Sequence, residues 1–564
     1  MIKIPFEKAR IDFHYTKELE DYRNEGLLQY SYDPESMLIR RMVFSPKAFE
    51  LKFKDKPLSS KIIFRDAHDL LDNIVLTEEM LEKTYHYKQG DYILEYGYAQ
   101  IGSFKNKAIF CFSLKEKQLV VYLLEWLDEN RLTERQLRTL EKIDKNFEYL
   151  RTLSNVLIIS DTMLFDCKTY PTRFEEFFEI LIERLQERFW LMDKQDYVYL
   201  AGFVVGSYFQ EMIETAPYIF VGGEKGSGKS RVLEALADMC YRTSRTGNIS
   251  IAVMVRELDW HRITLIFDEI VKDEERQTVE EKELFAMLRS GIRQGNYYKR
   301  MKNERAIGYY NAFGIKAFAT NRDLPSDIKD RCFVITMFKN PKFIPKVVTK
   351  SNYYAYINNF LSEMRIYYLL NYDIEEGKQS LNEFIKNLIN AGIEGRSAEV
   401  LGGLLFFVPR KYYPDNLKIK LESRLDEERY SETYDVYLAI KSVVARELGI
   451  EENQFSLNDM NKRVDIRFDA VVGGFCSLNG IDAEKLTERD KRSLMIRIGL
   501  ILRNKFGFKT YRKSVREGSE VTKVTYVTVD MRKLFSFYER YEREVVIKDY
   551  ERRSIFDIVT HRNL

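Results

Sequence analysis

The spacing of apolar residues predicts an accessory α+β region at the start of the chain. In residues 1–150, short runs of β-like sequence are interleaved with stretches of helical period. Strands are predicted at 60–64, 92–98 and 108–112, and helices at 119–130 and 133–154. No repeat and no catalytic motif occurs here, so the role of this region stays open.

A helical segment follows and leads into the middle of the chain. Residues 151–196 are expected to form a brace, and the helical period extends over 172–214. One apolar face contains Phe174, Phe177, Phe178, Ile180, Leu181 and Leu185. At 218–221 the pattern changes to a continuous apolar run, which predicts a buried strand.

Beyond residue 410 the pattern predicts helices followed by a β-hairpin. The apolar stripe of one helix, Leu494, Ile498, Ile501 and Leu502, follows a capping signal at Thr487. The predicted elements are helices at 437–448, 456–464 and from 487 to 506, strands at 509–515 and 522–529, and a last helix after Asp530. This order is the outline of a winged helix-turn-helix.

The strand at 218–221 is followed by a motif with a definite chemistry. Residues 223–230 read GEKGSGKS and fit G-x-x-x-x-G-K-[ST] without a mismatch, and a helical pattern resumes at Lys229. Glycines let successive backbone N–H groups face a phosphate, and the helix offers its positive N-terminal end. The expected nucleotide-binding residues are Gly223, Glu224, Lys225, Gly226, Ser227, Gly228, Lys229 and Ser230.

Within this loop, Lys229 is expected to reach the β- and γ-phosphates of ATP, and Ser230 to hold Mg²⁺. The alternative is a glycine-rich turn that carries Lys and Ser by chance. Because strand, loop and helix fall where the motif requires them, nucleotide binding is the favoured interpretation.

A second apolar run, 264–267, ends in Asp268 and Glu269 and has the form of a Walker B strand. Asp268 is expected to support the Mg²⁺, and Glu269 to polarise the attacking water as a general base. Two carboxylates after a strand also occur in simple solvated turns, which is the alternative.

Two further candidates follow the strand predicted at 315–320. Asn321 ends this strand and is expected to contact the γ-phosphate, although Asn is also common at turns. Arg331 precedes another apolar strand, where it could act as an arginine finger in a neighbouring subunit's site. Its alternative role is to interact with the C-terminal end of a helix.

The order GEKGSGKS, LIFDEI, LRSGIRQG and AFATNRDLPSDIKDRCFVI resembles AAA+ ATPases of plasmid, virus and integrative-element replication proteins, relatives of MCM-type and superfamily 3 helicases. The resemblance covers about residues 197–408. It implies a hexameric ring that moves along DNA using ATP. The short segment between the loop helix and residue 264, and the absence of a zinc-binding set in the first 200 residues, set the chain apart from true MCM proteins.

The resemblance also implies two further functional elements. One is a sensor 2 arginine, for which Arg396 is the best match, although it could equally be a surface helix residue. The other is a β-hairpin with a basic tip that touches DNA in the pore, for which residues 297–305 are the candidate. Its cations are Lys299, Arg300, Lys302 and Arg305, and Tyr297 and Tyr298 suit stacking on a single strand. The alternative is a solvated, charged hairpin.

Charge distribution singles out the C-terminal module. The whole chain of 564 residues has a net charge of only +2, yet residues 485–516 hold eleven basic and two acidic residues. A helix and wing with this balance suit contact with DNA phosphates. The expected contacts are Arg492, Arg497, Arg503, Lys505, Arg512 and Lys513. Winged helices also serve as adaptors between proteins, which leaves a second interpretation open.

The amino-acid composition limits the class of protein to which the chain can belong. Hydrophobic residues make up 45% of the chain, enough for large cores. The five cysteines are scattered and form no C-x-x-C, which argues for a reducing interior and against a zinc ribbon. No apolar signal segment or membrane span is recognised, so a soluble, cytoplasmic protein is expected.

The sequence thus predicts an α/β protein with a AAA+ P-loop NTPase core, a parallel sheet flanked by helices. The expected domains are an accessory α+β region at 1–150, a helical brace at 151–196, the ATPase core at 197–340, a helical lid at 341–430, a winged helix at 431–545 and a tail at 546–564. The expected function is an ATP- and Mg²⁺-dependent DNA helicase. Alternatives are an ATP-switched DNA-binding initiator or regulator, and a transposition-helper or packaging ATPase.

Overall fold

The computed structural model describes residues 16–33, 38–72, 83–126, 132–166, 168–223, 226–246, 250–268, 279–303, 306–319, 324–338, 340, 343–346, 354–390, 393, 395–413, 432–450, 462–479, 481–482, 486–504, 506, 508–517 and 520–534. The chain divides into two compact units, Met1–Pro414 with Asp549–Leu564, and Asp415–Lys548. No helix in the described ranges is long and apolar enough to cross a membrane.

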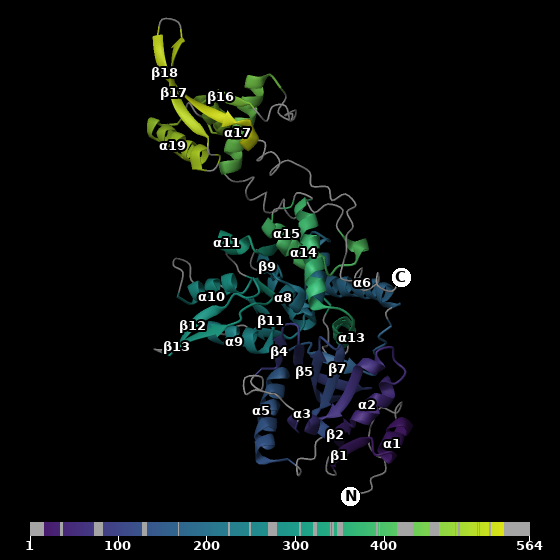
Figure 1. Cartoon of the computed structure of the whole chain (residues 1–564). Coiled ribbons are helices and arrows are strands. Elements are labelled where there is room, and N and C mark those ends of the chain that lie inside the picture. Colours follow the sequence, from purple (N-terminus) through teal and green to yellow (C-terminus); the bar gives the residue numbers. More distant parts are fainter. Residues whose placement is uncertain are drawn as a thin grey trace. The chain divides into compact units, whose positions relative to one another are not determined.

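A mixed sheet forms the accessory part of the first unit. Its strands are β3 (Ile62–Asp66), β4 (Tyr85–Lys88), β5 (Tyr92–Ile101), β6 (Phe104–Ser113), β7 (Gln118–Leu123) and β8 (Leu157–Ser160), in the order β3-β7-β6-β5-β4 with β8 beside β5. Helices α2 (Pro46–Phe53), α3 (Ala67–Asp72) and α5 (Glu134–Leu150) accompany it, and α1 (Thr16–Asn24) and the hairpin of β1 (Leu28–Asp33) and β2 (Leu38–Phe44) precede it (Figure 1).

Two sequence expectations for this region are wrong. The helix predicted at 119–130 is instead strand β7 followed by a 3-10 turn, Leu124–Trp126, as far as the structure describes it. Burial in β7 alternates with period two, because successive side chains of a strand point to opposite faces of the sheet. The boundary expected at residue 150 falls inside the fold, since β8 pairs with β5 over Gly97–Gln100.

A parallel sheet forms the centre of the first unit, as predicted. Its order is β10-β11-β14-β9-β15, so β14 separates the loop strand from the Walker B strand. The strands are β9 (Tyr218–Gly223), β10 (Thr243–Thr246), β11 (Thr264–Asp268), β14 (Lys316–Ala319) and β15 (Cys332–Met337). The helices in sequence with them are α8 (Lys229–Met239), α9 (Ile251–His261), α10 (Val279–Ser290) and α11 (Ser326–Lys329). The first four residues of β9 are buried, as expected for a parallel strand covered on both faces.

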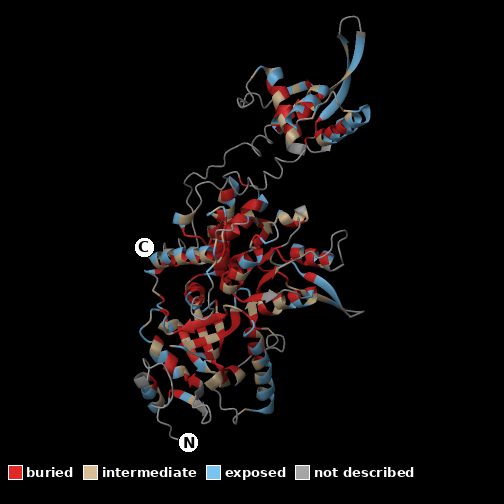
Figure 2. Cartoon of the chain, turned by 180° about the vertical axis from the view of Figure 1, so that it is seen from behind, coloured by how far each residue is buried: buried red, intermediate tan, exposed pale blue. Residues whose placement is uncertain are grey.

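The predicted hairpin is present between α10 and β14. It consists of β12 (Tyr298–Asn303) and β13 (Ala306–Tyr310), paired antiparallel. It extends away from the central sheet, and much of its length is exposed (Figure 2).

Helices before and after the central sheet in sequence complete the first unit. They are α6 (Tyr170–Arg188), α7 (Asp196–Ser207), α13 (Ala355–Asn371), α14 (Ile374–Asn390) and α15 (Gly395–Leu405), with 3-10 turns at Gln210–Met212 and Arg410–Tyr412. Helix α7 is almost completely buried and lies so close to α15 that a Cβ on Gly202 would come within 2.3 Å of the Leu404 carbonyl oxygen. Helix α13 packs against β8, so the region expected as a lid also braces the accessory sheet.

The second unit has the element order helix, strand, helix, helix, strand, strand. These are α17 (Glu432–Leu448), β16 (Arg463–Arg467), α18 (Phe468–Leu478), α19 (Glu488–Asn504), β17 (Lys509–Glu517) and β18 (Glu520–Asp530). The helix predicted at 456–464 is wrong at its end, where Arg463 and Val464 begin β16, and residues 456–461 lie outside the described residues. The cap predicted at Thr487 is present, because its hydroxyl accepts the Asp490 N–H at 3.2 Å.

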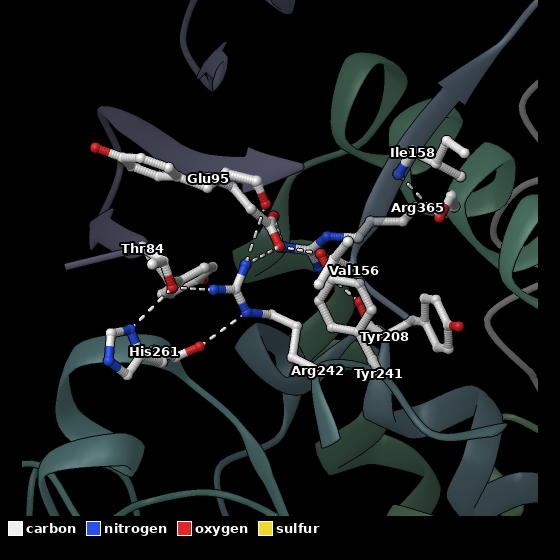
Figure 3. A network of polar contacts seen from close by, with 12 residues as sticks. Thr84, Glu95, Val156, Ile158, Tyr208, Tyr241, Arg242, His261 and Arg365 are labelled. Carbon is white, nitrogen blue, oxygen red and sulfur yellow. Dashed lines mark hydrogen bonds and ion pairs between the residues drawn. The ribbon is translucent and has the colours of Figure 1, made fainter. Parts of the chain in front are cut away.

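A buried network of charges joins the accessory sheet, the central sheet and helix α13 (Figure 3). Glu95 of β5 lies between two fully buried arginines, with Arg365 of α13 at 3.1 Å and Arg242, next to β10, at 3.3 Å. Arg365 also holds Glu211 at 2.9 Å. Burial alone would raise the pKa of Glu211, but the Arg365 guanidinium lowers it to about 2. Both buried carboxylates therefore form ion pairs with buried arginines.

We predict that Arg365→Met strongly destabilises the first unit. The variant leaves Glu95 and Glu211 buried with too little positive charge, a change that costs about 3–5 kcal/mol in comparable sites. Chemical denaturation followed by tryptophan fluorescence measures the loss. Arg138→Met is the control, because the Arg138–Glu134 pair is exposed and such pairs contribute about 0–1 kcal/mol. Equal stability of the two variants would contradict the network's role.

Candidate functional site

The loop between β9 and α8 requires glycine at defined positions. Gly223 has φ +134°, and a Cβ there would come within 2.4 Å of the Met337 carbonyl oxygen. Gly228 has φ +101° and stands at the N-cap of α8. Both positions favour glycine because side chains rarely tolerate these backbone angles. Gly226 also has positive φ, whereas Glu224 and Lys225 lie outside the described residues.

The first turn of α8 meets the end of the Walker B strand. The Ser230 hydroxyl donates to Asp268 Oδ2 at 2.6 Å, although 38 residues separate the two in sequence. Lys229 Nζ donates to the Gly223 carbonyl oxygen at 2.7 Å. Burial lowers the pKa of Lys229, and the Asp268 carboxylate partly counteracts that effect. The structure thus brings together the two motifs that the sequence placed apart.

The residues of this loop fit a triphosphate and a divalent cation. The Ser227 hydroxyl is buried and has no hydrogen-bond partner among the described residues, so it is available to a phosphate oxygen. The N-terminus of α8 adds backbone N–H groups and the positive end of the helix dipole. Ser230 and Asp268 offer the oxygen ligands that Mg²⁺ prefers.

Two further sequence candidates, Glu269 and Asn321, follow strands that end at the same edge of the sheet. Asp268 is in register with Ala319, and Ala319 with Val221, so β11, β14 and β9 end side by side. Ligands commonly bind at the carboxyl ends of such strands. Glu269 follows Asp268 directly and Asn321 comes two residues after Ala319, but both lie outside the described residues.

Arg331 and Arg396 lie at the opposite edge of the sheet. Arg331 immediately precedes Cys332, which pairs with Tyr218 at the start of β9, whereas the phosphate loop follows the end of β9. Five residue steps along a strand span about 17 Å. Arg396 joins Arg331 at this edge through an ion pair with Asp330 at 3.7 Å. The structure therefore separates these two arginines from Lys229 of the same chain.

The arginines line a pocket of about 340 Å³. Its charged residues are Arg289, Arg293, Arg331, Arg396, Asp330 and Glu399. Arg331 Nε donates to the Asp327 carbonyl oxygen at 3.0 Å, which is the helix-end interaction named as its alternative role. Arg289 and Arg293 belong to the LRSGIRQG stretch that contributes to the family resemblance, but the sequence assigned neither residue a role.

The hairpin presents cations beside an exposed apolar face. Lys299 and Arg300 are exposed, the Lys302 side chain is not described, and Arg305 lies outside the described residues. Tyr298 is only 9% exposed, so it packs on the core, whereas Tyr309 is 58% exposed with Lys299 Nζ 5.5 Å from its ring centre. Met301 and Ile307 pair across the strands on this same face and are both more than half exposed.

Sequence reasoning missed Tyr309 because it considered only the first strand of the hairpin. The pairing of Tyr309 with Lys299 depends on register, which the sequence of one strand does not contain.

The predicted basic surface of the second unit is exposed. Arg492, Arg497 and Arg503 lie on α19, and Arg512 and Lys513 on β17; each is exposed, whereas Lys505 lies outside the described residues. Helix α19 also exposes three apolar side chains, Met495, Ile496 and Leu500, between its basic residues. A mixed surface of this kind is compatible with nucleic acid and with protein partners.

No protein-family model matches this chain, and no curated protein sequence matches it. Among solved structures, the apo A form of the NrS-1 C-terminal region is similar over 62% of this chain and 76% of its own length, with 13% identity and a TM-score of 0.30. JCV helicase is similar over 57% of this chain and 82% of its own, with 13% identity and a TM-score of 0.22. Likeness at this level assigns no function to this chain.

We predict that Lys229→Ala abolishes binding of Mg²⁺-ATP. The change removes the buried ammonium that closes the loop on Gly223 and would face the phosphates. Binding of a fluorescent ATP analogue measures the loss, and the expected decrease is at least tenfold. Lys282→Ala on the exposed face of α10 is the control. Unchanged affinity of the Lys229 variant would remove the phosphate-loop assignment.

Proposed function

We propose that this chain is an ATP-driven DNA helicase or translocase that serves replication of a mobile genetic element. The observation that carries the proposal is the 2.6 Å contact between Ser230 and Asp268, which unites a complete phosphate loop with a Walker B carboxylate. In this arrangement Lys229, Ser227 and the loop amides would hold the phosphates, and Ser230 and Asp268 would hold Mg²⁺.

Bound Mg²⁺ would neutralise charge that develops on the transferred phosphoryl group. Around it, Glu269 would orient and deprotonate the attacking water, and Asn321 would contact the γ-phosphate. Burial of the Lys229 ammonium strengthens its interaction with an anion, because less water screens it.

We further propose that the active site is completed by a second copy of the chain. Arg331 and Arg396 stand at the sheet edge away from their own phosphate loop, so they suit contact with nucleotide bound to a neighbour. A repeated contact of this head-to-tail type closes into a ring, and we propose a hexamer.

Two surfaces of the chain suit DNA. The hairpin of β12 and β13 combines Lys299 and Arg300 with exposed Tyr309, a pairing that supports contact with phosphates and stacking on bases of a single strand. In the second unit, the element order and the basic faces of α19 and β17 support a winged helix on duplex or forked DNA.

The proposal predicts ATP-dependent strand displacement on a forked DNA duplex. Wild-type protein should release the labelled strand with Mg²⁺-ATP, and Lys229→Ala should release none. ATP hydrolysis and DNA binding without any displacement would favour the alternative, an ATP-switched DNA-binding initiator or regulator. Absence of ATP hydrolysis with and without DNA would overturn the enzyme assignment itself.

Tyr309→Ala should weaken binding of single-stranded DNA about fivefold to a hundredfold, because stacking contributes about 1–3 kcal/mol per base. Tyr309→Phe retains the ring and should bind like the wild type. Fluorescence anisotropy with labelled oligo(dT) measures both, and ATP binding should not change in either variant. An alanine variant with normal affinity would show that the exposed face has another occupant, such as the hairpin of a second copy.

A further inference from the structure

The end of α10 is held firmly against the central sheet. The Tyr218 hydroxyl of β9 donates to the Leu288 carbonyl oxygen at 3.0 Å, and the Ala216 N–H donates to the Ile292 carbonyl oxygen at 2.7 Å. A Cβ on Gly291 would come within 2.4 Å of the Ala312 carbonyl oxygen, so the backbone packs here without a side chain. Arg289 therefore projects from a fixed part of the fold.

Arg289 reaches across to α11 and holds it by two bonds. Its Nε donates to Asp327 Oδ2 at 2.6 Å and its Nη2 to Asp327 Oδ1 at 3.3 Å. This fork-shaped pairing restricts geometry more than a single bond does. The Arg289 guanidinium also lowers the pKa of the Asp327 carboxyl below its usual value. Helix α11 has only four residues, too few for a helix to be stable alone.

Asp327 also forms a hydrogen bond with Arg331. The Asp327 carbonyl oxygen accepts Arg331 Nε at 3.0 Å, and the Arg331 N–H donates to the Ile328 carbonyl oxygen at 3.0 Å. The side chain of Asp327 thus fixes α11 to α10, while its backbone fixes the direction of the Arg331 guanidinium.

Arg331 differs from its neighbours in the pocket. Arg289 pairs with Asp327, Arg293 with Glu399 at 2.7 Å, and Arg396 with Asp330 at 3.7 Å. Within the described residues, Arg331 pairs with no carboxylate. Its terminal nitrogens are the donors best placed to meet an external anion.

We propose that Arg289 is the positioning residue of Arg331, acting through Asp327 to aim the Arg331 guanidinium at the triphosphate bound by a second copy of this chain. The inference rests on the proposed function, in which Arg331 completes a neighbour's site. Arg289 touches no nucleotide in this account; it determines whether Arg331 arrives in the right place. Displacement of a catalytic group by about 1 Å can lower a rate about a hundredfold.

The test is complementation between inactive subunits. Glu269→Gln subunits are expected to bind ATP without cleaving it, and they retain the intact arginines. Arg289→Gln subunits retain an intact phosphate loop and Walker B pair. Alone, Arg289→Gln should lower the ATPase kcat about tenfold to a hundredfold with little change in KM for ATP, and mixing with Glu269→Gln subunits should restore activity.

Four comparisons make the experiment more specific. Arg331→Ala should be restored by the same Glu269→Gln subunits, whereas a mixture of Arg289→Gln and Arg331→Ala should stay inactive. The charge-swapped pair, Arg289→Asp with Asp327→Arg, should regain part of the activity that each single change removes. Arg65→Gln is the matched control and should keep normal kcat, because the Arg65–Asp69 pair is about as exposed as Arg289–Asp327 but lies in the accessory sheet.

Each outcome bears on the inference. If Arg331→Ala is complemented but Arg289→Gln is not, Arg289 acts within its own subunit and the positioning role is wrong. If neither is complemented, the shared site itself is wrong and the positioning role falls with it. An Arg289→Gln variant with normal kcat would overturn the inference while leaving the proposed function intact.

Discussion

The first unit depends on a small group of opposite charges that water does not reach. Glu95, Glu211, Arg242 and Arg365 come from the accessory sheet, the turn before β9, the approach to β10 and helix α13. None of these side chains could be buried alone, since an unpaired charge in the interior is very unfavourable. The four must therefore assemble together, and the four segments that carry them assemble with them. The accessory region is thus part of the structural foundation of the central sheet.

The central sheet separates two groups of polar and charged residues. Its carboxyl edge collects the phosphate loop and Asp268, and its amino edge collects Arg331, Arg396 and the end of α10. Because the strands between them are nearly rigid, the two sets cannot meet within one chain. The shared site proposed between copies is consistent with this geometry, and it would make ATP turnover sensitive to how subunits are arranged. The hairpin begins at Tyr298, five residues after Arg293, which lines the pocket of the arginines.

The two surfaces proposed for DNA differ in character. The hairpin is short and mixes cations with an aromatic and apolar face, whereas the second unit is basic over a long helix and strand. The first suits a single strand whose bases are available for stacking, and the second suits phosphates of a duplex. Their different chemistry is compatible with one protein that engages both parts of a fork.

The sequence by itself determined the elements whose signal is local. The strand-loop-helix order around Lys229, strand β11, the hairpin and the capped helix at Thr487 each depend on a few adjacent residues, and the structure has these elements. It failed at 119–130, where a short apolar run can be read as helix or strand until burial decides. Only the tertiary structure brought Ser230 to Asp268, set Tyr309 across from Lys299 and joined Arg289 to Asp327. The physical reason is that such contacts between distant residues depend on strand order and register, which no local pattern encodes.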